Sequence, residues 1–260
     1  MLRVGVLGAG GRMGTAVCAA VRADPELELV AAVDPAYAGT VLETAGLVAA
    51  PGPGALAEAG AEVAVDFTLA PAVAGNAAWC AAHGVHAVIG TTGLSAEALA
   101  EMEKSFAPGP ANCIFAPNFA IGAVLMMRFA ELAAPWFETV EVVELHHDGK
   151  LDSPSGTALQ TARRIAAARG AVAAPASASS APSQGPARGV QAAPGVQVHS
   201  VRLRGLVAHQ EVLLGTAGQI LTLRHDSLDR VSFMPGVLLA VKAVPGRRGF
   251  TLGLDALLGL

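Results

Sequence analysis

The stretch LRVGVLGAGGRMG, residues 2–14, decides the fold of this chain. Its first half, Leu2 to Leu7, is a short apolar run that is typical of a buried strand. A glycine-rich turn follows, and from Met13 onward apolar residues recur at helical spacing. The order strand, glycine turn, helix is typical of the first unit of a nucleotide-binding α/β domain.

The same order repeats along the first half of the chain. We expect further strands at 27–33, 63–67 and 85–89, and helices at 72–83 and 95–106. The hydroxyl of Ser95 is expected to cap the second of these helices. Strands that alternate with helices predict a parallel sheet with helices on both faces.

The pattern changes after Pro117. A long apolar helix is expected at 121–134 and an alternating strand at 139–145. Three further strands separated by glycine turns predict a largely antiparallel sheet, and we place them at 196–203, 208–214 and 219–225. A helix at 235–244 and a short strand at 249–254 follow. Residues 171–191 are low-complexity Ala/Ser/Pro/Gly, which predicts a mobile surface loop.

These patterns predict an α/β fold class: a Rossmann-like parallel sheet domain with a second α+β domain that carries a mostly antiparallel sheet. The length of 260 residues and the 53% of apolar residues suffice for such cores. Apolar runs are far shorter than the ~20 residues of a bilayer span, and the N-terminus leaves no room for a secretory signal. We therefore expect a cytoplasmic protein without membrane contact.

The formal net charge of −4 argues against nucleic acid as a partner. Cys18, Cys80 and Cys113 lack C-x-x-C spacing, so we expect reduced, buried thiols and neither disulfide nor zinc site. No metal site is expected, because adjacent histidines rarely share one ion and no third ligand recurs at useful spacing.

The glycine turn has the features of a phosphate loop. The standard G-x-G-x-x-G spacing is not met, since Met13 takes the third glycine position, but Gly8, Gly11 and Gly14 meet G-x-x-G-x-x-G. Backbone N–H groups at such a helix start bind pyrophosphate. Asp34, at the end of the second strand, is placed to accept hydrogen bonds from ribose hydroxyls and favours NAD, whereas Arg12 could offset repulsion of a 2′-phosphate.

A second run, ELHHDGKLDSPSGTA at residues 144–158, concentrates ionisable groups in a chain that is only 15% charged. His146 and His147 can serve one site only if the strand ends there, and Asp148-Gly149 supplies a turn. Lys150 offers a positive charge to a carboxylate, and an ammonium or imidazolium can donate a proton to a carbanion or imine nitrogen.

Residues 153–157, SPSGT, read as a helix start with capping hydroxyls and a proline in the first turn. Free N–H groups at such a start suit a second carboxylate. The whole run predicts a binding site for a small dianion with acid catalysts attached. A purely structural histidine pair is the competing interpretation.

These residues resemble the bacterial 4-hydroxy-tetrahydrodipicolinate reductase (dihydrodipicolinate reductase) family of lysine and diaminopimelate biosynthesis. The resemblance rests on the glycine turn, the run at 144–157 and four further segments, namely 66–68, 90–93, 116–119 and 202–211. It implies an oxidoreductase that uses NADH and/or NADPH to reduce the imine formed when a cyclic hydroxy dicarboxylate loses water. Which nucleotide is preferred stays open.

The resemblance also implies roles for single residues. His146 would be the catalytic acid/base, Lys150 the proton donor, and His147, Gly156 and Thr157 would hold the substrate. The residues implied to contact the nucleotide are Gly8, Ala9, Gly10, Gly11, Arg12, Met13, Asp34, Gly90, Thr91, Thr92, Ala116, Pro117, Asn118 and Phe119. The family usually has a histidine immediately before the lysine, where this chain has Gly149, so substrate affinity could be lower here.

For the whole chain, the resemblance implies a nucleotide-binding domain at 1–117 that is completed by 227–260. It implies a substrate-binding and oligomerisation domain at 118–226, and a homotetramer built through the sheet of that domain. Two other readings stay open: another Rossmann amino-acid dehydrogenase of the homoserine type, and a nucleotide sensor without turnover. Short-chain dehydrogenases are excluded, because Tyr37, the only tyrosine, is followed four residues later by Val41 instead of lysine.

Overall fold

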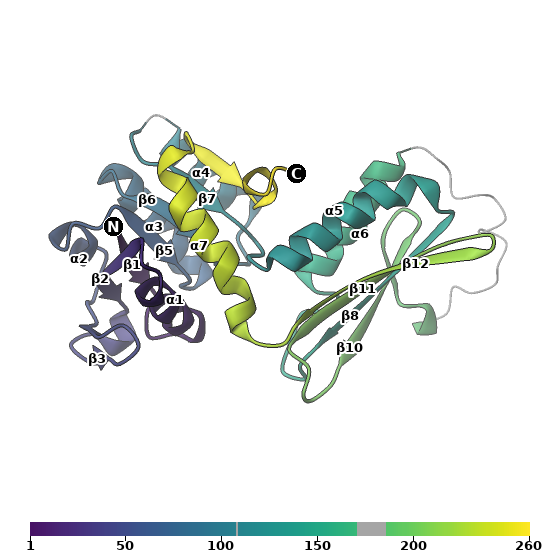
Figure 1. Ribbon diagram of the computed structural model, residues 1–260, viewed down its shortest axis with the longest axis horizontal. Coiled ribbons are helices and arrows are strands. Elements are labelled where there is room, and N and C mark those ends of the chain that lie inside the picture. Colours follow the sequence, from purple (N-terminus) through teal and green to yellow (C-terminus); the bar gives the residue numbers. More distant parts are fainter. Residues whose placement is uncertain (108, 171–185) are drawn as a thin grey trace. The chain divides into compact units, whose positions relative to one another are not determined.

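The computed structural model describes residues 1–107, 109–170 and 186–260 (Figure 1). The described residues form two compact units. Unit 1 contains Met1–Ala120 and Phe233–Leu260, and unit 2 contains Ile121–Ser232. The domain boundaries expected from the sequence, 117/118 and 226/227, lie a few residues away from these limits.

Unit 1 is built on a six-stranded sheet in the order β13-β7-β6-β5-β1-β2. Every neighbouring pair of strands in it is parallel. The C-terminal strand β13 is thus an edge of the sheet that begins at the N-terminus. The strands are β1 (Leu2–Leu7), β2 (Leu27–Val33), β5 (Val63–Asp66), β6 (His86–Ile89), β7 (Cys113–Phe115) and β13 (Phe250–Leu252).

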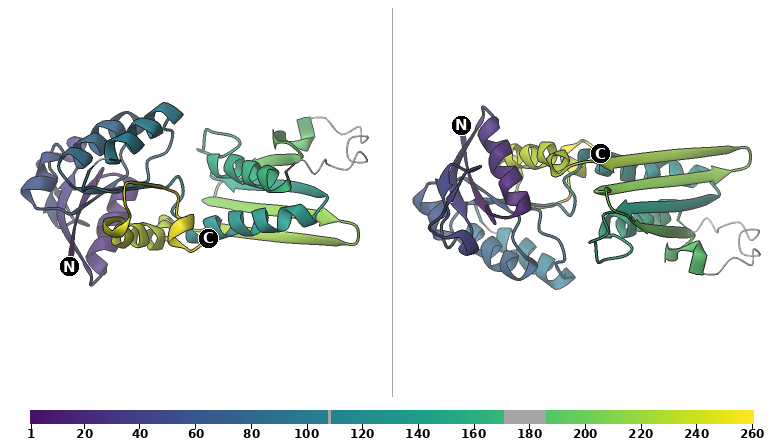
Figure 2. Two further views of the ribbon diagram at one scale, coloured as in Figure 1. Left: turned by 90° about the horizontal axis from the view of Figure 1, so that it is seen from above. Right: turned by 90° about the horizontal axis from the view of Figure 1, so that it is seen from below.

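Helices cover both faces of this sheet (Figure 2). Along the sheet, the step from β1 to β2 and the step from β5 to β6 run in opposite directions. Because such connections are right-handed, the helices of the two steps lie on opposite faces. On one face α1 (Arg12–Ala23) contacts α7 (Met234–Ala243), and on the other α3 (Ala70–Ala82) contacts α4 (Ala96–Phe106). The short α2 (Gly54–Glu58) packs on β2, and β3 (Val41–Leu42) and β4 (Leu47–Val48) form a small hairpin.

Unit 2 is built on a five-stranded sheet in the order β12-β11-β8-β10-β9. Its pairs are antiparallel except β8 with β10, which run parallel. The strands are β8 (Thr139–His146), β9 (Val190–Ala193), β10 (Val196–Arg202), β11 (Ala208–Thr216) and β12 (Gln219–Ser227). The predicted fold class is confirmed, with a parallel Rossmann-like sheet in one unit and a mostly antiparallel sheet in the other.

Two helices cover one face of the sheet of unit 2. The helix α5 (Ile121–Ala133) contacts β11 and β12, and α6 (Gly156–Arg169) contacts β8, β9 and β10. Alternate residues of β8 are therefore buried, among them Val140, Val142 and Glu144. Because a strand side chain alternates between faces, a glutamate in this register lies among the apolar residues that pack under the helices.

Two local predictions are wrong. Residues 171–185 of the predicted loop lie outside the described residues, but Val190 and Gln191 belong to β9, whose backbone pairs with β10. At the C-terminal end of the predicted loop, pairing with β10 places these residues in a strand despite their low-complexity composition. Pro154 is not in the first turn of a helix, because α6 begins at Gly156 with Ser155 as its N-cap.

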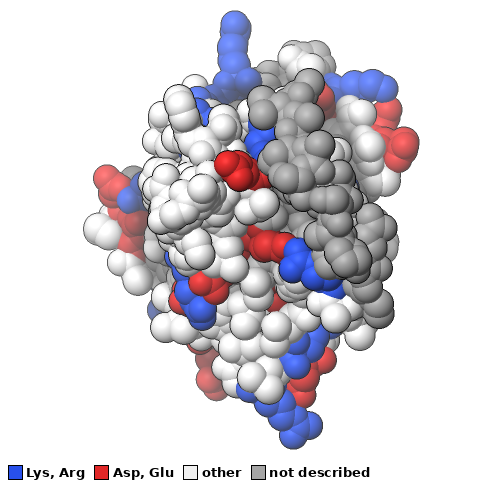
Figure 3. Space-filling view, turned by 90° about the vertical axis from the view of Figure 1, so that its right-hand side faces the viewer, with Lys and Arg blue, Asp and Glu red and all other residues white. Residues whose placement is uncertain are grey.

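Charge on the surface is mixed. On the face shown in Figure 3, basic and acidic side chains are interspersed among uncharged residues, and no broad area of one sign is visible among the described residues. Within the described ranges, no helix combines the length and the apolar character needed to cross a membrane.

Candidate functional site

The glycine turn after β1 is held by backbone hydrogen bonds to β2 and within the turn. Gly8 N–H donates to the Val33 carbonyl at 2.8 Å, and Gly11 N–H donates to the Gly8 carbonyl at 3.0 Å. Gly8 has a positive φ of 79°, and a Cβ on Gly14 would lie 2.0 Å from the Gly8 oxygen. Only glycine fits at Gly14, so the start of α1 approaches the end of β1 as closely as a phosphate loop requires.

The start of α1 is open to an anion. Its N-cap is Gly11, and no side chain caps the first turn. Gly11 and Arg12 are exposed, whereas Ala9 is buried beneath them. The N–H groups of this turn can therefore bind a phosphate, and Arg12 adds a positive charge near them.

Asp34 is held against the glycine turn. Its Oδ2 accepts a hydrogen bond from Gly10 N–H at 3.0 Å, and its Oδ1 accepts one from Ala36 N–H at 3.1 Å. The ring of Tyr37 lies over Gly10, where an added Cβ would come within 2.3 Å of Tyr37 Cδ2. The sequence reasoning did not assign Tyr37 to this site, although it lies only three residues beyond Asp34.

The two other predicted nucleotide loops, 90–92 and 116–119, follow β6 and β7. Gly90 faces the ring of Phe67, and Phe67 contacts Phe119 with ring centroids 5.7 Å apart. Asp66 binds Thr91 and Thr68 through Oδ1 and Asn76 through Oδ2. Asp66 and Phe67 thus tie together the loops that follow β5, β6 and β7.

The candidate nucleotide residues all belong to unit 1, at the carboxyl ends of its parallel strands. Thr91, Ala116 and Phe119 are buried, so their side chains serve packing, while Thr92 and Pro117 are exposed. Met13 and Asn118 are partly buried, and Asn118 Oδ1 accepts a hydrogen bond from Ala120 N–H. The arrangement offers backbone groups along one edge, where doubly wound sheets bind their ligands.

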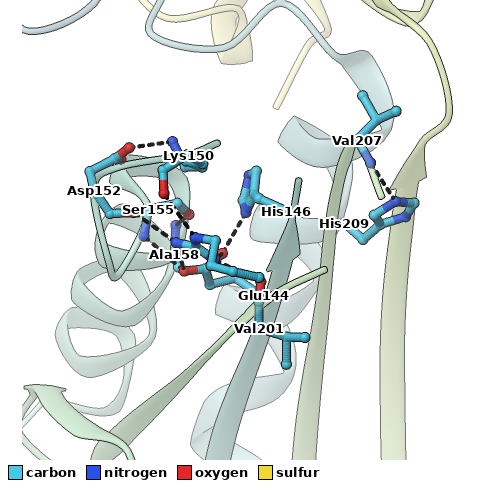
Figure 4. A network of polar contacts seen from close by, with 10 residues as sticks. Glu144, His146, Lys150, Asp152, Ser155, Ala158, Val201, Val207 and His209 are labelled. Atoms are coloured by element: carbon cyan, nitrogen blue, oxygen red, sulfur yellow. Dashed lines mark hydrogen bonds and ion pairs between the residues drawn. The ribbon is translucent and has the colours of Figure 1, made fainter. Parts of the chain in front are cut away.

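The second candidate cluster lies wholly in unit 2, around the end of β8 (Figure 4). The strand ends at His146, and Lys150 N–H donates to the His147 carbonyl at 3.1 Å in the turn that follows. His147 is exposed and His146 partly buried. The predicted turn after the histidines is present, so the two rings are not confined to opposite faces of a continuing strand.

His146 is bound to a buried carboxylate. Its Nδ1 lies 2.5 Å from Glu144 Oε2, and the Glu144 side chain has no exposure to solvent. Burial by itself raises the pKa of Glu144, but hydrogen bonds from His146, Arg202 and Ser200 outweigh that effect and lower the pKa to about 2. Glu144 is therefore an acceptor at neutral pH, and the Nδ1–H of His146 is the donor.

Arg202, at the end of β10, completes the pairing of Glu144. Its Nη1 and Nη2 donate to the two oxygens of Glu144 at 2.9 and 2.8 Å. Its other hydrogen bonds go to backbone carbonyls, those of Lys150 at 3.3 Å, Asp152 at 2.7 Å and Val201 at 2.8 Å. A planar guanidinium suits this combination of a bidentate pair and several carbonyls.

Lys150 forms an ion pair with Asp152, with Nζ and Oδ1 2.6 Å apart. Burial raises the pKa of Asp152, but the hydrogen bond and the charge of Lys150, together with smaller contributions from a backbone hydrogen bond and His146, outweigh burial, so that the pKa lies below its ordinary value. The Lys150 side chain is mostly buried, at 22% exposure. Asp152, which is more than half exposed, holds the ammonium group in the structure and was not singled out from the sequence.

The helix α6 starts next to Glu144. Ser155 Oγ accepts a hydrogen bond from Ala158 N–H at 3.2 Å, and Ser155 N–H donates to Glu144 Oε1 at 3.2 Å. Gly156 is exposed, with open space where a side chain would be, and Thr157 follows it in the first turn. His146, Lys150 and the start of α6 are thus joined through one buried carboxylate and its arginine.

The sequence reasoning named the ends of this network but missed its centre. Glu144 and Arg202 received no role, although each stands in a segment that carries the family resemblance. A signal was available for Glu144: it continues the buried register of Val140 and Val142, and a charged residue in that register requires an ionic partner. Nothing in the sequence identifies the partner 58 residues away.

No group of three or more histidine, cysteine or acidic residues that could hold a metal ion occurs among the described residues. The cysteines Cys18, Cys80 and Cys113 are free and buried, and burial raises the pKa of the thiols of Cys18 and Cys80 to about 12. Neutral thiols at these depths are poor nucleophiles, which agrees with acid chemistry at the His146 cluster instead.

The chain is similar to known proteins along its whole length. Residues 2–119 match the family model described as the N-terminus of dihydrodipicolinate reductase, and residues 122–258 match the model of its C-terminus. A 4-hydroxy-tetrahydrodipicolinate reductase of Nocardia farcinica is 55% identical, with 100% of this chain and 99% of the relative covered. One of Cutibacterium acnes is 50% identical, with both chains covered completely.

Solved structures agree with these matches. A dipicolinate-bound dihydrodipicolinate reductase from Paenisporosarcina sp. TG-14 is 38% identical, with a TM-score of 0.84 and coverage of 98% of this chain and 99% of that one. A probable dehydrogenase from Thermotoga maritima has a TM-score of 0.68 at 12% identity, covering 98% and 92% of the two chains. The second likeness shows the fold alone.

A Rossmann-like sheet with a phosphate-type glycine turn, followed by a second unit with acid groups, defines an oxidoreductase that uses a pyridine nucleotide. The chain belongs to the dihydrodipicolinate reductase family. The resemblance drawn from the sequence is confirmed, as is the use of NADH or NADPH by its N-terminal unit.

Proposed function

We propose that this chain reduces 4-hydroxy-tetrahydrodipicolinate to tetrahydrodipicolinate with loss of water, in the biosynthesis of diaminopimelate and lysine. The observation that carries the proposal is the cluster at the end of β8, where His146, Lys150 and the start of α6 are linked through Glu144 and Arg202. Such a cluster combines proton donors with a binding site for carboxylate.

The residues of unit 1 fit a pyridine nucleotide. The glycine turn admits no side chain at Gly14, and the first turn of α1 is uncapped, so both leave room and donors for a pyrophosphate. A bound reduced nicotinamide supplies a hydride. We propose that the predicted residues from Gly8 to Met13, with Asp34, 90–92 and 116–119, contact the nucleotide.

The residues of unit 2 fit a dianion. The ammonium of Lys150 and the ring of His147 can neutralise carboxylate charge, and the N–H groups of Gly156 and Thr157 lie at the start of α6, where the helix dipole favours an anion. A relative that is 38% identical was solved with dipicolinate bound, a planar dicarboxylate. That ligand supports a dicarboxylate as the class of substrate, and we propose His147, Gly156 and Thr157 as the residues that hold it.

His146 and Lys150 are proposed as the proton donors. Hydride transfer to the ring carbon of a conjugated imine sends an electron pair toward the ring nitrogen or the adjacent carbon, and a positioned acid quenches that charge. His146 is oriented by Glu144 through its Nδ1, so its Nε2 is the nitrogen available for proton exchange. Lys150 would exchange Asp152 for a substrate carboxylate.

The variant Lys150→Ala tests the proposal. We expect turnover to fall by about 10²-fold or more, because a general acid contributes on that order. NADH binding, measured by nicotinamide fluorescence, should stay unchanged, since Lys150 belongs to unit 2. Wild-type turnover by this variant would contradict the assignment, and Lys104→Ala, at an exposed ion pair on α4, is the control.

Two further properties follow the family. We propose that the chain acts in the cytoplasm and assembles as a homotetramer through the face of the unit 2 sheet that α5 and α6 leave uncovered. Ile220, on the edge strand β12, is 76% exposed and is one apolar side chain that such an interface could cover. Light scattering on the purified protein should give four times the mass of one chain.

A further inference from the structure

We propose that Glu144 and Arg202 act as a positioning pair that fixes the proton on His146 and, through the same carboxylate, the segment that carries Lys150. The inference rests on the proposed function and adds two residues to its site. Neither residue faces the substrate in this account. They act through the groups that they hold.

The two oxygens of Glu144 are fully committed to donors. Oε1 accepts from Ser155 N–H and from Arg202 Nη2, and Oε2 accepts from His146 Nδ1 and from Arg202 Nη1. The side chain is fully buried, so no solvent can replace a lost partner without rearrangement. The Ser200 hydroxyl also donates to this carboxylate, and among all these donors only that hydroxyl and the imidazole can change into acceptors.

This arrangement determines the tautomer of His146. An ionised carboxylate accepts and never donates, so the proton of the neutral ring lies on Nδ1 and its Nε2 carries the lone pair. When the ring gains a second proton at Nε2, Glu144 stabilises the imidazolium that results. Glu144 therefore supports both protonation states that a general acid/base needs.

Arg202 links this ring to the lysine. Its Nε and Nη2 donate to the backbone carbonyls of Lys150 and Asp152, while Nη1 and Nη2 bind Glu144. The guanidinium of Arg202 therefore binds Glu144 and also the backbone of Lys150 and Asp152, the two residues of the ion pair. A lysine at this position could not make the bidentate pair and both carbonyl contacts at once.

The variant Glu144→Gln makes the pair testable. An amide NH₂ in place of Oε1 would face two obligate donors, Ser155 N–H and Arg202 Nη2. In place of Oε2 it faces Arg202 and the imidazole, and the imidazole can accept. The amide nitrogen should therefore point at His146 Nδ1, which moves the ring proton to Nε2.

We expect three results for Glu144→Gln. The value of kcat should fall on the order of 10²- to 10³-fold, within the range that general acid–base catalysis contributes. The inhibition constant of pyridine-2,6-dicarboxylate should stay within about threefold, because the start of α6 keeps its contact through the amide oxygen. Imidazole ¹⁵N spectra should show the His146 proton on Nδ1 in the wild type and on Nε2 in the variant.

Arg202→Lys is the second arm. It keeps the positive charge and loses the carbonyl contacts that hold the Lys150 segment. We expect the KM for the dicarboxylate to rise about tenfold or more, with a smaller loss of kcat than in Glu144→Gln. A scaffold role alone predicts the same loss of stability and activity for both variants, without this division between kcat and KM.

Glu141→Gln is a matched control. Glu141 lies on the same strand, three residues earlier, on the opposite face, and it likewise binds a histidine and an arginine, His199 at 2.6 Å and Arg188. It touches none of the residues assigned to the reaction, so its kcat should match that of the wild type. Thermal unfolding of all variants shows whether each is folded.

Three results would overturn the inference: wild-type kcat in Glu144→Gln, an unchanged His146 tautomer, or an equal loss of kcat and inhibitor binding. The tautomer measurement needs no turnover. If the wild type neither reduces the substrate nor binds the dicarboxylate while the tautomer shifts as expected, the proposed function fails and the positioning of His146 stands.

Discussion

At the scale of single residues, the central feature is that a carboxylate without solvent exposure stays ionised. Burial of Glu144 opposes ionisation, and three groups of hydrogen-bond donors overcome it, lowering the pKa to about 2 from the ordinary 4.5. The charge is retained because hydrogen-bond donors contact both oxygens of the carboxylate. A buried charge with so many partners strongly constrains the conformation of its neighbours.

This pairing predicts a specific sensitivity to acid. The folded-state pKa of Glu144 is lowered, so its contribution to stability is fully present above pH 4.5 and is lost as the pH falls toward 2. The shift corresponds to about 3 kcal/mol. Urea unfolding between pH 5 and pH 2.5 should show a steeper loss of unfolding free energy for the wild type than for Glu144→Gln. If the unfolding free energies of the two proteins fell in parallel as the pH is lowered, that result would contradict the pairing.

Gly149 gives a second prediction at this scale. Its φ is not positive, and an added Cβ would lie 3.4 Å from His147 Nδ1, an ordinary contact, so a side chain fits. Gly149→His introduces the residue that the family usually carries. One added hydrogen bond of about 1 kcal/mol should tighten pyridine-2,6-dicarboxylate binding about fivefold. Gly149→Ala is the control, and equal inhibition of all three proteins would refute the effect.

At the scale of elements, two helices start with the same cap. Ser155 caps α6 and Ser95 caps α4, each accepting an N–H bond at 3.2 Å. Removing either hydroxyl should cost about 1 kcal/mol of stability. Only Ser155→Ala should also raise the KM for the dicarboxylate, because α6 alone begins at the proposed substrate site. Similar KM values in Ser155→Ala and Ser95→Ala would argue against α6 as the carboxylate site.

Helical glycines give another matched pair. A Cβ on Gly14 of α1 would meet the Gly8 oxygen at 2.0 Å, whereas one on Gly75 of α3 meets nothing within 4 Å. Gly14→Ala should abolish NADH binding and destabilise unit 1. Gly75→Ala should leave binding intact and raise the unfolding free energy by about 0.5–1 kcal/mol, the difference in helix propensity. Calorimetry with and without NADH measures both effects, and intact NADH binding by Gly14→Ala would contradict the phosphate-loop role.

The strands and helices that the sequence predicted well are those whose burial is regular. The strand at 27–33 matches β2, and the helix at 95–106 is capped by Ser95 as expected, because periodicity and capping are local signals. The strand β9 was missed, since its residues form a strand only by pairing with β10. Glu144 and Arg202 depend in the same way on a contact between distant segments, which no local pattern records.

At the scale of the whole molecule, the family matches cover both units, one model for each. The proposed nucleotide residues belong to unit 1 and the proposed acid and dicarboxylate residues to unit 2. The network around Glu144 (Figure 4) is formed by residues of unit 2 alone. Division of the two tasks between the units explains why Lys150→Ala is expected to spare nucleotide binding.

The most direct test of the account follows nicotinamide absorbance while a partner synthase makes the unstable cyclic substrate in situ, with NADH and NADPH offered in turn. We expect substrate-dependent oxidation of at least one nucleotide by the wild type. We also expect inhibition by pyridine-2,6-dicarboxylate and loss of the signal in Lys150→Ala. No oxidation of either nucleotide by a folded protein that binds NADH would contradict the proposed reaction and favour a nucleotide sensor.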